Sequence, residues 1–391
     1  MVLLEVDLVV LVWVEHQRVN MKKQHVSVRP DLAEKCEAVG FNYKDVDGHV
    51  YWDESRCYQF TETQIDDIDD ITTELHSMAI EATKSIITEG SYDKYHIPLE
   101  FVPMIEDSWN KGEKHLYGRM DLCYTSDGQF KLFEYNADTP TSLLEASIVQ
   151  WDWLCDMFPK ADQFNSIHEK LIARWKEVVG NNLVYFTCLK DNIEDINTTE
   201  YLMRTATEAG LPVEWIFVDD IGHNKFTNRF VDLQDYPIDK LFKLYPSEWM
   251  LDEEFAQFIV GSQTQFVEPI WKVITSSKAL LVKMWEMFPN HPNMLATYFE
   301  PDRLSNYARK PIFSREGANI LINAHGDTFL TDGDYGQVPF IYQDYCELPK
   351  FGDSYALIGS WVIGDQAAGI GIREDSTLVT RNTSRFIPHY F

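Results

Sequence analysis

Basic residues are scarce in this 391-residue chain, which has 34 Lys and Arg against 62 Asp and Glu and a formal net charge of −28. A surface with this excess of negative charge repels phosphate backbones, so nucleic acid is not expected as a partner. The same charge would favour a cationic ligand such as a polyamine, although acidity that serves only solubility is the commoner explanation. Composition alone leaves both explanations open.

Several motifs of metal, redox and nucleotide sites are also missing. The six cysteines form no C-x-x-C pair, and the chain contains no H-E-x-x-H, no Walker motif and no G-x-G-x-x-G. These absences argue against a disulfide framework, a zinc protease centre, a P-loop and a Rossmann cofactor site. Five of the six cysteines lie in or beside apolar runs, so they are expected to be small buried residues in a reducing cytoplasm.

Long hydrophobic runs are absent as well. The most apolar segment, MVLLEVDLVVLVWV at the N-terminus, is interrupted by Glu5 and Asp7, has no basic residues before it and no small-residue cleavage site after it. It is too short and too charged to span a membrane, so no membrane association is expected. Because Met21 is followed by two lysines, it is a candidate start. We therefore expect residues 1–20 to be an upstream extension outside the fold and residues 21–391 to form the functional module.

Local signals predict a long helix and a hairpin in the N-terminal half. Residues 61–90 are expected to be helical, because Thr61 and Gln64 have the spacing of a capping box and Gly90 can end the helix. Residues 115–135 predict two strands joined by a turn at Asp127-Gly128, a strong hairpin signal.

A second helix is expected after Pro140. Thr141 or Ser142 can cap it, and Glu145 would follow in its first turn. Its buried face is expected to contain Leu144, Ile148 and Trp151.

The C-terminal half changes character twice. Residues 180–245 alternate strand, helix and strand, which predicts a βαβ unit with a parallel sheet covered on both faces. A helix over residues 267–288 is expected to contain Lys278 within it. Beyond residue 305 the apolar period becomes two in several segments, the last being residues 376–381, which predicts antiparallel strands. The expected fold is therefore mixed, α/β in one part and α+β in the other.

The two strands of residues 115–135 carry an unusual set of polar residues. Glu134 and Asn136 are two apart and share one face of a strand, as do Arg119 and Asp121. Carboxylate and amide oxygens suit magnesium better than zinc, and a guanidinium binds a phosphate or carboxylate bidentately. A polar strand edge with surface ion pairs explains the same pattern about as well.

The C-terminal half offers a second basic group. Lys310 lies on an expected strand and is followed by a Ser-Arg-Glu-Gly loop at residues 314–317, which could fold over phosphates. Arg373 is expected at a strand end, where it could close a site. Pairing of Arg373 with Glu374 or Asp375 is the commoner alternative.

Six ordered blocks carry a resemblance to a known family. The segments YGRMDL…KLFEYNADTPTSLLEA, FKLYPSEWM, EPIWKVITSSKALL, RKPIFSREGANI, LPKFGDSYALIGSWV and GIGIREDSTLVTRNTSRFIPHY together resemble the synthetase part of glutathionylspermidine synthase and its single-domain relatives. The similarity runs from about residue 25 to the C-terminus. It implies an ATP-grasp fold, ATP, Mg²⁺ and amide formation through an acyl phosphate, with nucleotide binding in about residues 265–391.

The resemblance also implies roles for individual residues. The catalytic cations would be Arg119 and Arg373, and the metal ligands Asp121, Glu134 and Asn136. The substrate residues would be Thr139, Glu194 and Asp195, the last two on the amine side. The nucleotide residues would be Arg119, Met120, Asp121, Lys278, Lys310, Arg315, Glu316, Gly317, Gln343, Asp344, Tyr345, Cys346, Leu378, Val379 and Thr380.

Three departures from the family pattern bear on the substrates. The full-length synthase has a cysteine amidase domain for which this chain has no room, so amide hydrolysis is not expected. The synthase-type serine after Asn-Ala-Asp is Thr139 here, and the acidic pair is Glu-Asp rather than Glu-Glu. Small-molecule acid and amine substrates are expected, with their identities and the oligomeric state left open. The alternatives are a nucleotide-binding homologue without ligase activity and a two-carboxylate hydrolase.

Overall fold

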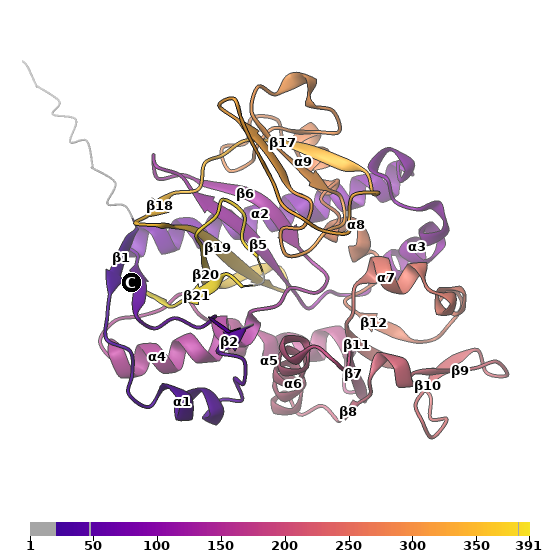
Figure 1. The fold of residues 1–391 in the computed structure, drawn as a ribbon. Coiled ribbons are helices and arrows are strands. Elements are labelled where there is room, and N and C mark those ends of the chain that lie inside the picture. Colours follow the sequence, from indigo (N-terminus) through magenta and orange to yellow (C-terminus); the bar gives the residue numbers. More distant parts are fainter. Residues whose placement is uncertain (1–20, 47, 382) are drawn as a thin grey trace, which may run out of the picture.

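The computed structural model describes residues 21–46, 48–381 and 383–391, so the expectation for residues 1–20 lies outside the described residues. A central antiparallel sheet has the order β21-β20-β19-β5-β6, with β18 paired to β19 (Figure 1). The strands are β5 Tyr117–Tyr124, β6 Phe130–Asn136, β18 Lys350–Phe351, β19 Ser354–Ile363, β20 Gln366–Asp375 and β21 Arg385–Ile387. The sheet thus joins the hairpin of residues 115–135 to the C-terminal strands.

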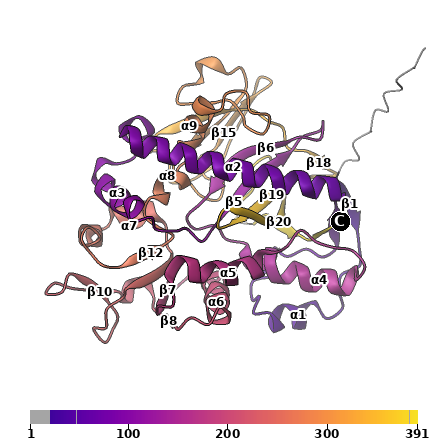
Figure 2. The same ribbon diagram turned by 180° about the vertical axis from the view of Figure 1, so that it is seen from behind.

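A long helix covers one face of this sheet, as the view from behind shows (Figure 2). This is α2 (Glu62–Glu89), in which Thr61 and Gln64 form the expected capping box and Gly90 ends the helix in the left-handed conformation. The capping prediction is confirmed, because both of its hydrogen bonds are local and depend on spacing alone. Beside α2 lie α3 (Val102–Asn110), α8 (Lys272–Ser276) and α9 (Leu280–Met287).

The other face of the sheet packs on helices and on a second sheet. The helix after Pro140 begins as a π-helical turn over Glu145–Val149 and continues as α4 (Gln150–Met157), and α5 is Ile167–Val179. The π turn inserts a residue and rotates the face that follows, so Trp151 is 44% exposed and Glu145 is fully buried. The prediction for this helix face was therefore wrong for Trp151, although Leu144 is buried.

The expected βαβ region is a parallel sheet with the order β12-β11-β7-β8. Its elements are β7 Val184–Cys188, α6 Ile193–Glu208, β8 Val213–Trp215, β11 Lys240–Leu244 and β12 Gln265–Val267. A small hairpin of β9 (Gly222–Asn224) and β10 (Arg229–Val231) and helix α7 (Ser247–Asp252) extend from it. The strand–helix–strand prediction is confirmed.

An antiparallel five-stranded sheet with the order β13-β17-β14-β15-β16 stands above the central sheet (Figure 1). Its strands are β13 Thr297–Tyr298, β14 Tyr307–Pro311, β15 Leu321–Ala324, β16 Asp327–Leu330 and β17 Phe340–Asp344. The segment of residues 376–381 is a loop, not the expected strand, because the Asp375 side chain accepts from Thr377 N and pairs with Arg381. These local contacts replace a strand partner.

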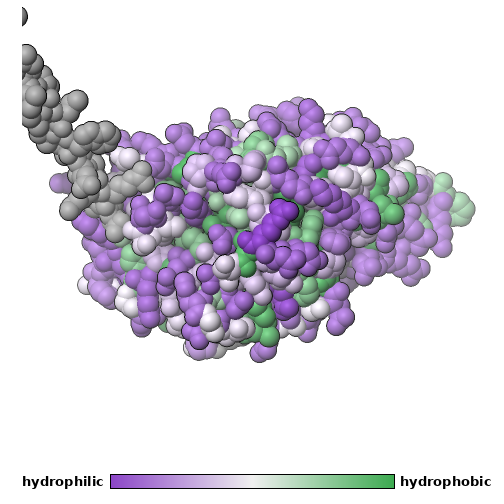
Figure 3. All heavy atoms as spheres, turned by 90° about the horizontal axis from the view of Figure 1, so that it is seen from above, coloured by the Kyte–Doolittle hydropathy of each residue, from purple (hydrophilic) through white to green (hydrophobic). Residues whose placement is uncertain are grey.

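The remaining elements are short and lie mainly at the N-terminal side. They are β1 Lys22–His25, α1 Leu32–Ala38, β2 Asp45–Val46, β3 His49–Val50, β4 Arg56–Gln59 and β22 His389–Tyr390, with 3₁₀ turns at Asp93–Tyr95, Leu99–Phe101, Val218–Asp220, Glu254–Phe258 and Pro301–Arg303. Cys36, Cys57, Cys123 and Cys188 are buried as expected, Cys346 is half-buried and Cys155 is exposed. Within the described chain, no helix combines the length and apolar character that crossing a membrane requires. Hydrophilic residues cover most of the upper face (Figure 3).

Candidate active site

The β5–β6 hairpin builds the polar face that its sequence predicts. Asp121 pairs with Glu134 and Arg119 with Asn136 across the two strands. Because alternate residues of a strand point to one side, these four side chains share one face of the sheet. Met120 points the other way into the hydrophobic core. The same-face prediction is confirmed, whereas the side chain of Met120 does not reach the cavity.

The four side chains contact one another directly. Arg119 donates from Nε to Asp121 Oδ1 (2.8 Å), and Asn136 donates from Nδ2 to Glu134 Oε1 (3.1 Å). Burial raises the pKa of Asp121, whereas for Glu134 the opposing charges of two lysines outweigh burial and hold its pKa at about 2. Glu134 is therefore an anion at neutral pH.

A glycine on β19 makes room for Arg119. Gly359 pairs with Asp121, and a Cβ at Gly359 would lie 2.8 Å from Cδ of Arg119. The guanidinium carbon lies 5.8 Å from the ring centroid of Trp361, also on β19, and Nη1 donates to the carbonyl of Thr141 at 2.8 Å. Arg119 thus lies flat across β19, which holds its charge in place beside Asp121.

Two lysines approach Glu134 from outside the hairpin. Lys278 lies at a break between α8 and α9, not within one helix as expected, because Ser277 adopts an extended conformation. Its Nζ lies 3.4 Å from Glu134 Oε2 and donates to the carbonyl of Ser314. Lys310 on β14 donates to Gln343 Oε1 (2.7 Å), and burial lowers the pKa of Lys310 to about 8.

These groups border a cavity between the central and five-stranded sheets. Apolar residues from both sheets wall it, and its floor carries Asp121, Glu134 and the two lysines. Of the nucleotide residues that the resemblance implies, the cavity is lined by Asp121, Lys278, Lys310, Glu316, Gly317, Gln343, Asp344, Tyr345, Cys346, Leu378, Val379 and Thr380. The structure therefore brings together residues that lie up to 259 positions apart in the sequence, from Asp121 to Thr380.

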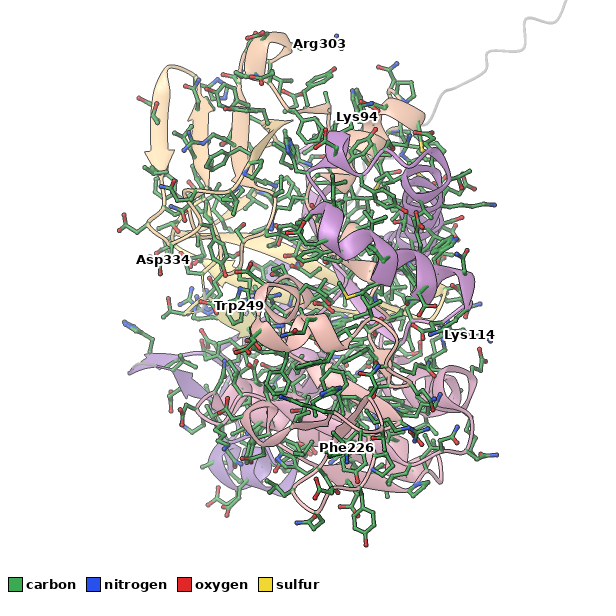
Figure 4. All side chains as sticks on the ribbon, turned by 90° about the vertical axis from the view of Figure 1, so that its right-hand side faces the viewer. Lys94, Lys114, Phe226, Trp249, Arg303 and Asp334 are labelled. Atoms are coloured by element: carbon green, nitrogen blue, oxygen red, sulfur yellow. The ribbon has the colours of Figure 1, made fainter. Side chains whose placement is uncertain are left out.

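The loop of residues 314–317 lies across this cavity. Gly317 has φ +70°, and a Cβ there would lie 2.6 Å from the carbonyl oxygen of Thr380, so glycine is required for this contact. Arg315 donates to Thr139 Oγ1 (2.5 Å) and pairs with Glu248 Oε1 (3.2 Å), which lies on α7. The loop therefore contacts the first cavity at Thr380 and the parallel-sheet region at Glu248. Figure 4 shows the neighbouring Trp249 between these layers.

A second cavity adjoins the first on the side of the parallel sheet. It shares Asp121, Glu134, Glu316, Gly317 and Thr380 with the first cavity. It is also lined by Arg119, Asn136, Thr139, Glu194, Asp195, Arg315, Trp249 and Arg373. All substrate residues that the resemblance implies thus meet the metal-ligand candidates in one space.

The acidic wall of the second cavity begins at the N-terminus of α6. Asn192 caps the helix by accepting from the backbone N–H groups of Glu194 and Asp195. Burial, with the nearby charge of Glu194, raises the pKa of Asp195 to about 7. A carboxyl group with this pKa is poised for a cationic partner, because an opposite charge would favour its ionised form.

Arg373 lines both this cavity and a smaller one beside it, and it forms no ion pair with any described residue. It lies within β20, and Asp375 and Glu374 pair instead with Arg381 (2.9 Å) and Lys23 (2.7 Å). The alternative in which Arg373 pairs with these neighbours is therefore wrong. Its Nη2 donates to the carbonyl of Arg381, and its Nε is buried without a hydrogen-bond partner among the described residues. A half-buried guanidinium with a free donor and no carboxylate partner suits an anionic ligand.

Glu145 is a buried acid that the sequence did not reveal as such. It accepts a hydrogen bond from the Tyr51 hydroxyl (2.6 Å), and its Oε2 has no partner in the described chain. Burial, with the charge of Glu194, raises the pKa of Glu145 to about 7. The sequence signal for its burial was its position directly after Leu143 and Leu144. The π turn directs the Glu145 side chain inward.

The chain matches the family described as glutathionylspermidine synthase preATP-grasp over residues 23–391. It is 44% identical over 383 residues to a Haemophilus influenzae protein provisionally named an acid–amine ligase, with 93% of this chain and 97% of that protein covered. It is 29% identical to trypanothione synthetase of Crithidia fasciculata and 27% identical to bifunctional glutathionylspermidine synthetase/amidase of Escherichia coli K12, over 80% and 88% of this chain. The matches span 53% and 61% of those two proteins.

A solved structure has a similar arrangement. It is that of a glutathione synthetase-like effector from Globodera pallida, with a TM-score of 0.56, 11% sequence identity, and coverage of 92% of this chain and 95% of that one. At this identity the likeness supports the mixed α/β fold alone.

Proposed function

Because the chain belongs to the glutathionylspermidine synthase family, we propose that it is an ATP- and Mg²⁺-dependent ligase with an ATP-grasp fold that joins a carboxylate to an amine. The observation that carries this proposal is the pair of adjoining cavities. One has apolar walls and two lysines, the other has an acidic wall and unpaired arginine, and both contain Asp121 and Glu134. A nucleotide in the first cavity would present its phosphates to substrates in the second.

The residues present fit a magnesium ion. Asp121 and Glu134 offer two carboxylates, and Asn136 contributes an amide whose oxygen and nitrogen exchange places by rotation about one bond. The amide nitrogen now donates to both carboxylates, which shows that the three groups are within reach of a common point. The metal would supply positive charge to neutralise phosphate oxygens.

Joining a carboxylate to an amine in water is uphill, so the carboxylate must first be activated. In the proposed sequence a carboxylate oxygen attacks the γ-phosphorus and ADP leaves, which forms an acyl phosphate. The neutral amine then attacks the acyl carbon, and phosphate leaves as the nitrogen loses a proton. Arg119 and Arg373, which both line the second cavity, would hold the transferring phosphoryl group and the acyl carboxylate.

Water must be kept away from the acyl phosphate. Glu316 and Gly317 of the loop line both cavities and Arg315 lines the second, so the loop would shield the acyl phosphate from solvent. Glu194 and Asp195 line the second cavity and would attract a cationic amine. We propose a peptide-like acid and a polyamine-like amine as the substrate classes.

Phosphate release from ATP tests the proposal. The protein is incubated with ATP, Mg²⁺ and mixtures of small peptides and amines, with each component omitted in turn. Release that requires both an acid and an amine is expected for the ligase. Tight nucleotide binding without turnover would instead identify a binding protein, and bond cleavage without ATP would identify a hydrolase.

A further inference from the structure

Two histidines and an aspartate meet at the end of the central sheet away from the nucleotide cavity. His76 lies on α2, His115 lies two residues before β5, and Asp365 lies in the turn between β19 and β20. Figure 2 shows α2 crossing the sheet that contains these three strands. Residues 76, 115 and 365 are thus joined only by folding, and none of them lines either cavity of the proposed active site.

The spacing of the three side chains fits a metal ion. Asp365 Oδ1 lies 3.2 Å from His115 Nε2 and 3.7 Å from His76 Nε2. One ligand atom from each residue lies within 4.8 Å of the others. In a tetrahedral zinc site with bonds of about 2.0–2.1 Å, ligand atoms lie roughly 3.3–3.4 Å apart. The observed spacing therefore needs only small side-chain movements to close around an ion.

The two imidazoles are buried and turned toward the aspartate. Their side chains are 3% and 6% exposed. His115 Nε2 lies within hydrogen-bond distance of Asp365 Oδ1, and a bound ion would replace this contact by bonds to both atoms. His76 Nε2 is buried and has no hydrogen-bond partner among the described residues. A buried nitrogen without a partner is costly, and a metal bond would satisfy it.

The surroundings orient the ligands as at known metal centres. His76 Nδ1 is 2.9 Å from the hydroxyl of Tyr135, which holds the ring so that Nε2 faces Asp365. Arg174 lies 3.7 Å from Asp365 Oδ2, the oxygen that His115 and His76 do not approach. Lys272, the other nearby cation, is occupied by Glu268 (2.6 Å). Asp365 is 71% exposed at its side chain, so one coordination position would stay open to water.

We propose that His76, His115 and Asp365 form a second metal site, which binds a divalent transition metal ion such as Zn²⁺. Two imidazoles and one carboxylate suit Zn²⁺, Co²⁺, Ni²⁺ or Cu²⁺ and not Mg²⁺, which prefers oxygen ligands alone. The bound ion ties α2 to both β5 and the β19–β20 turn. It is therefore a clamp on the sheet that carries Asp121, and its place in the fold is independent of the proposed ligase activity.

Cobalt binding to the full chain tests this proposal. The parent protein is titrated with Co²⁺ in the presence of millimolar Mg²⁺, which occupies the hard-oxygen site, and visible absorption is recorded. One equivalent with the absorption of histidine-bound Co²⁺ is expected. Asp365→Asn should weaken Co²⁺ binding about tenfold or more. Zn²⁺ should raise the melting temperature of the parent and not that of the variant.

Asp353→Asn is the matched control, because Asp353 lies in the exposed turn at the other end of β19. It should bind Co²⁺ like the parent. His76→Gln should abolish the signal, and since His76 is buried, Asp365→Asn keeps the test decisive if the His76 variant fails to fold. Equal Co²⁺ affinity in the parent and in Asp365→Asn, or no histidine-type absorption in the parent, would overturn the proposal.

Discussion

The two walls of the active-site region differ in how their polar groups are satisfied. The nucleotide-side wall is the lining of the first cavity around Lys278 and Lys310, and the substrate-side wall is the lining of the second cavity that contains Asp195 and Arg373. On the nucleotide side the charged groups contact one another: Lys278 pairs with Glu134, and Lys310 donates to Gln343. On the substrate side polar atoms are left over, such as Nε of Arg373 and Nε of Arg315. The first wall is complete before a ligand arrives, whereas the second needs a ligand to satisfy it. We infer that the first wall determines the reaction type and the second selects the substrates.

Removal of a charge from the nucleotide-side wall should have the largest effect. Glu134→Gln keeps the shape and removes the anion that Lys278 and Lys310 face. Ligation should fall at least about 10³-fold, because a metal ligand and the partner of two cations are lost together. Asn136→Ala should reduce Mg²⁺ affinity less, since it removes a neutral ligand. Steady-state phosphate release against Mg²⁺ concentration measures both.

Glu214→Gln on β8 is the control for this experiment, because Glu214 is exposed and lies outside both cavities. Its turnover should match the parent. A folded Glu134→Gln protein with parental turnover would show that the metal assignment is wrong.

Arg373 provides the corresponding change on the substrate-side wall. Arg373→Gln should lower kcat/KM about 10²-fold while the melting temperature changes little, because within the described chain Arg373 loses no ion pair and only the hydrogen bond from Nη2 to the carbonyl of Arg381. Arg381→Gln breaks the pair with Asp375 and should show the reverse, lower stability with smaller kinetic change. Thermal unfolding of both variants compares their stability, and initial rates compare their kcat/KM. Equal loss of stability in the two variants would contradict the idea that Arg373 is held for a ligand.

Gly317 joins the two walls, and it has a matched control in Gly326. Both have positive φ, +70° and +89°, but a Cβ would meet Thr380 only at Gly317 and nothing within 4 Å at Gly326. Each alanine variant should lose about 1 kcal/mol of stability through backbone strain. Only Gly317→Ala should raise the KM for ATP, by about tenfold, because the loop must move away from Thr380. Similar ATP kinetics in the two variants would remove the loop from the site.

Local signals in the sequence predicted the elements that depend on neighbouring residues and missed the features that depend on long-range packing. The capping box of α2 and the β5–β6 hairpin depend on residues a few positions apart, so their spacing was sufficient. The need for Gly359 beside Arg119 depends on the pairing of β5 with β19, in which Gly359 pairs with Asp121, 238 positions away, and no local pattern encodes this. The helix break at Lys278 and the burial of Glu145 on a π turn were not predicted, for a related reason. In both cases tertiary packing overrides a regular helical period.

The functional residues were predicted from the family resemblance more than from chemistry. Spacing alone left the hairpin face divided between a metal site and a surface ion-pair network. The structure shows that Asp121 and Asn136 line a cavity with residues of the C-terminal half, whereas their role as metal ligands stays a prediction. No local pattern points to the transition-metal candidates His76, His115 and Asp365, since their sequence spacing matches no metal motif and only folding brings them together.

The smallest expected effect is a change in stability when Glu194 and Asp195, the acidic wall of the second cavity, are replaced. Two explanations of these residues predict changes of opposite sign in the free energy of unfolding. If Glu194 and Asp195 only stabilise the N-terminus of α6, then Glu194→Gln/Asp195→Asn should lose roughly 0.3–1 kcal/mol per residue. However, the pKa of Asp195 is raised to about 7, so the folded state holds a proton that the unfolded state releases near pH 4. Stability therefore falls as pH rises from about 4 to 7. Asn at position 195 removes this loss, and the double variant should be more stable than the parent at pH 8 by about 1 kcal/mol.

Amine kinetics on the same double variant complete the test. In the parent the KM for a cationic amine should fall between pH 6 and pH 8, as Asp195 ionises, and added salt should raise it by screening. The variant should lose both trends and keep its affinity for ATP, because Lys278 and Lys310 are untouched. A variant that is less stable than the parent at pH 8, with an unchanged amine KM, would assign the two acids to helix stabilisation. The amine would then have to bind elsewhere in the second cavity.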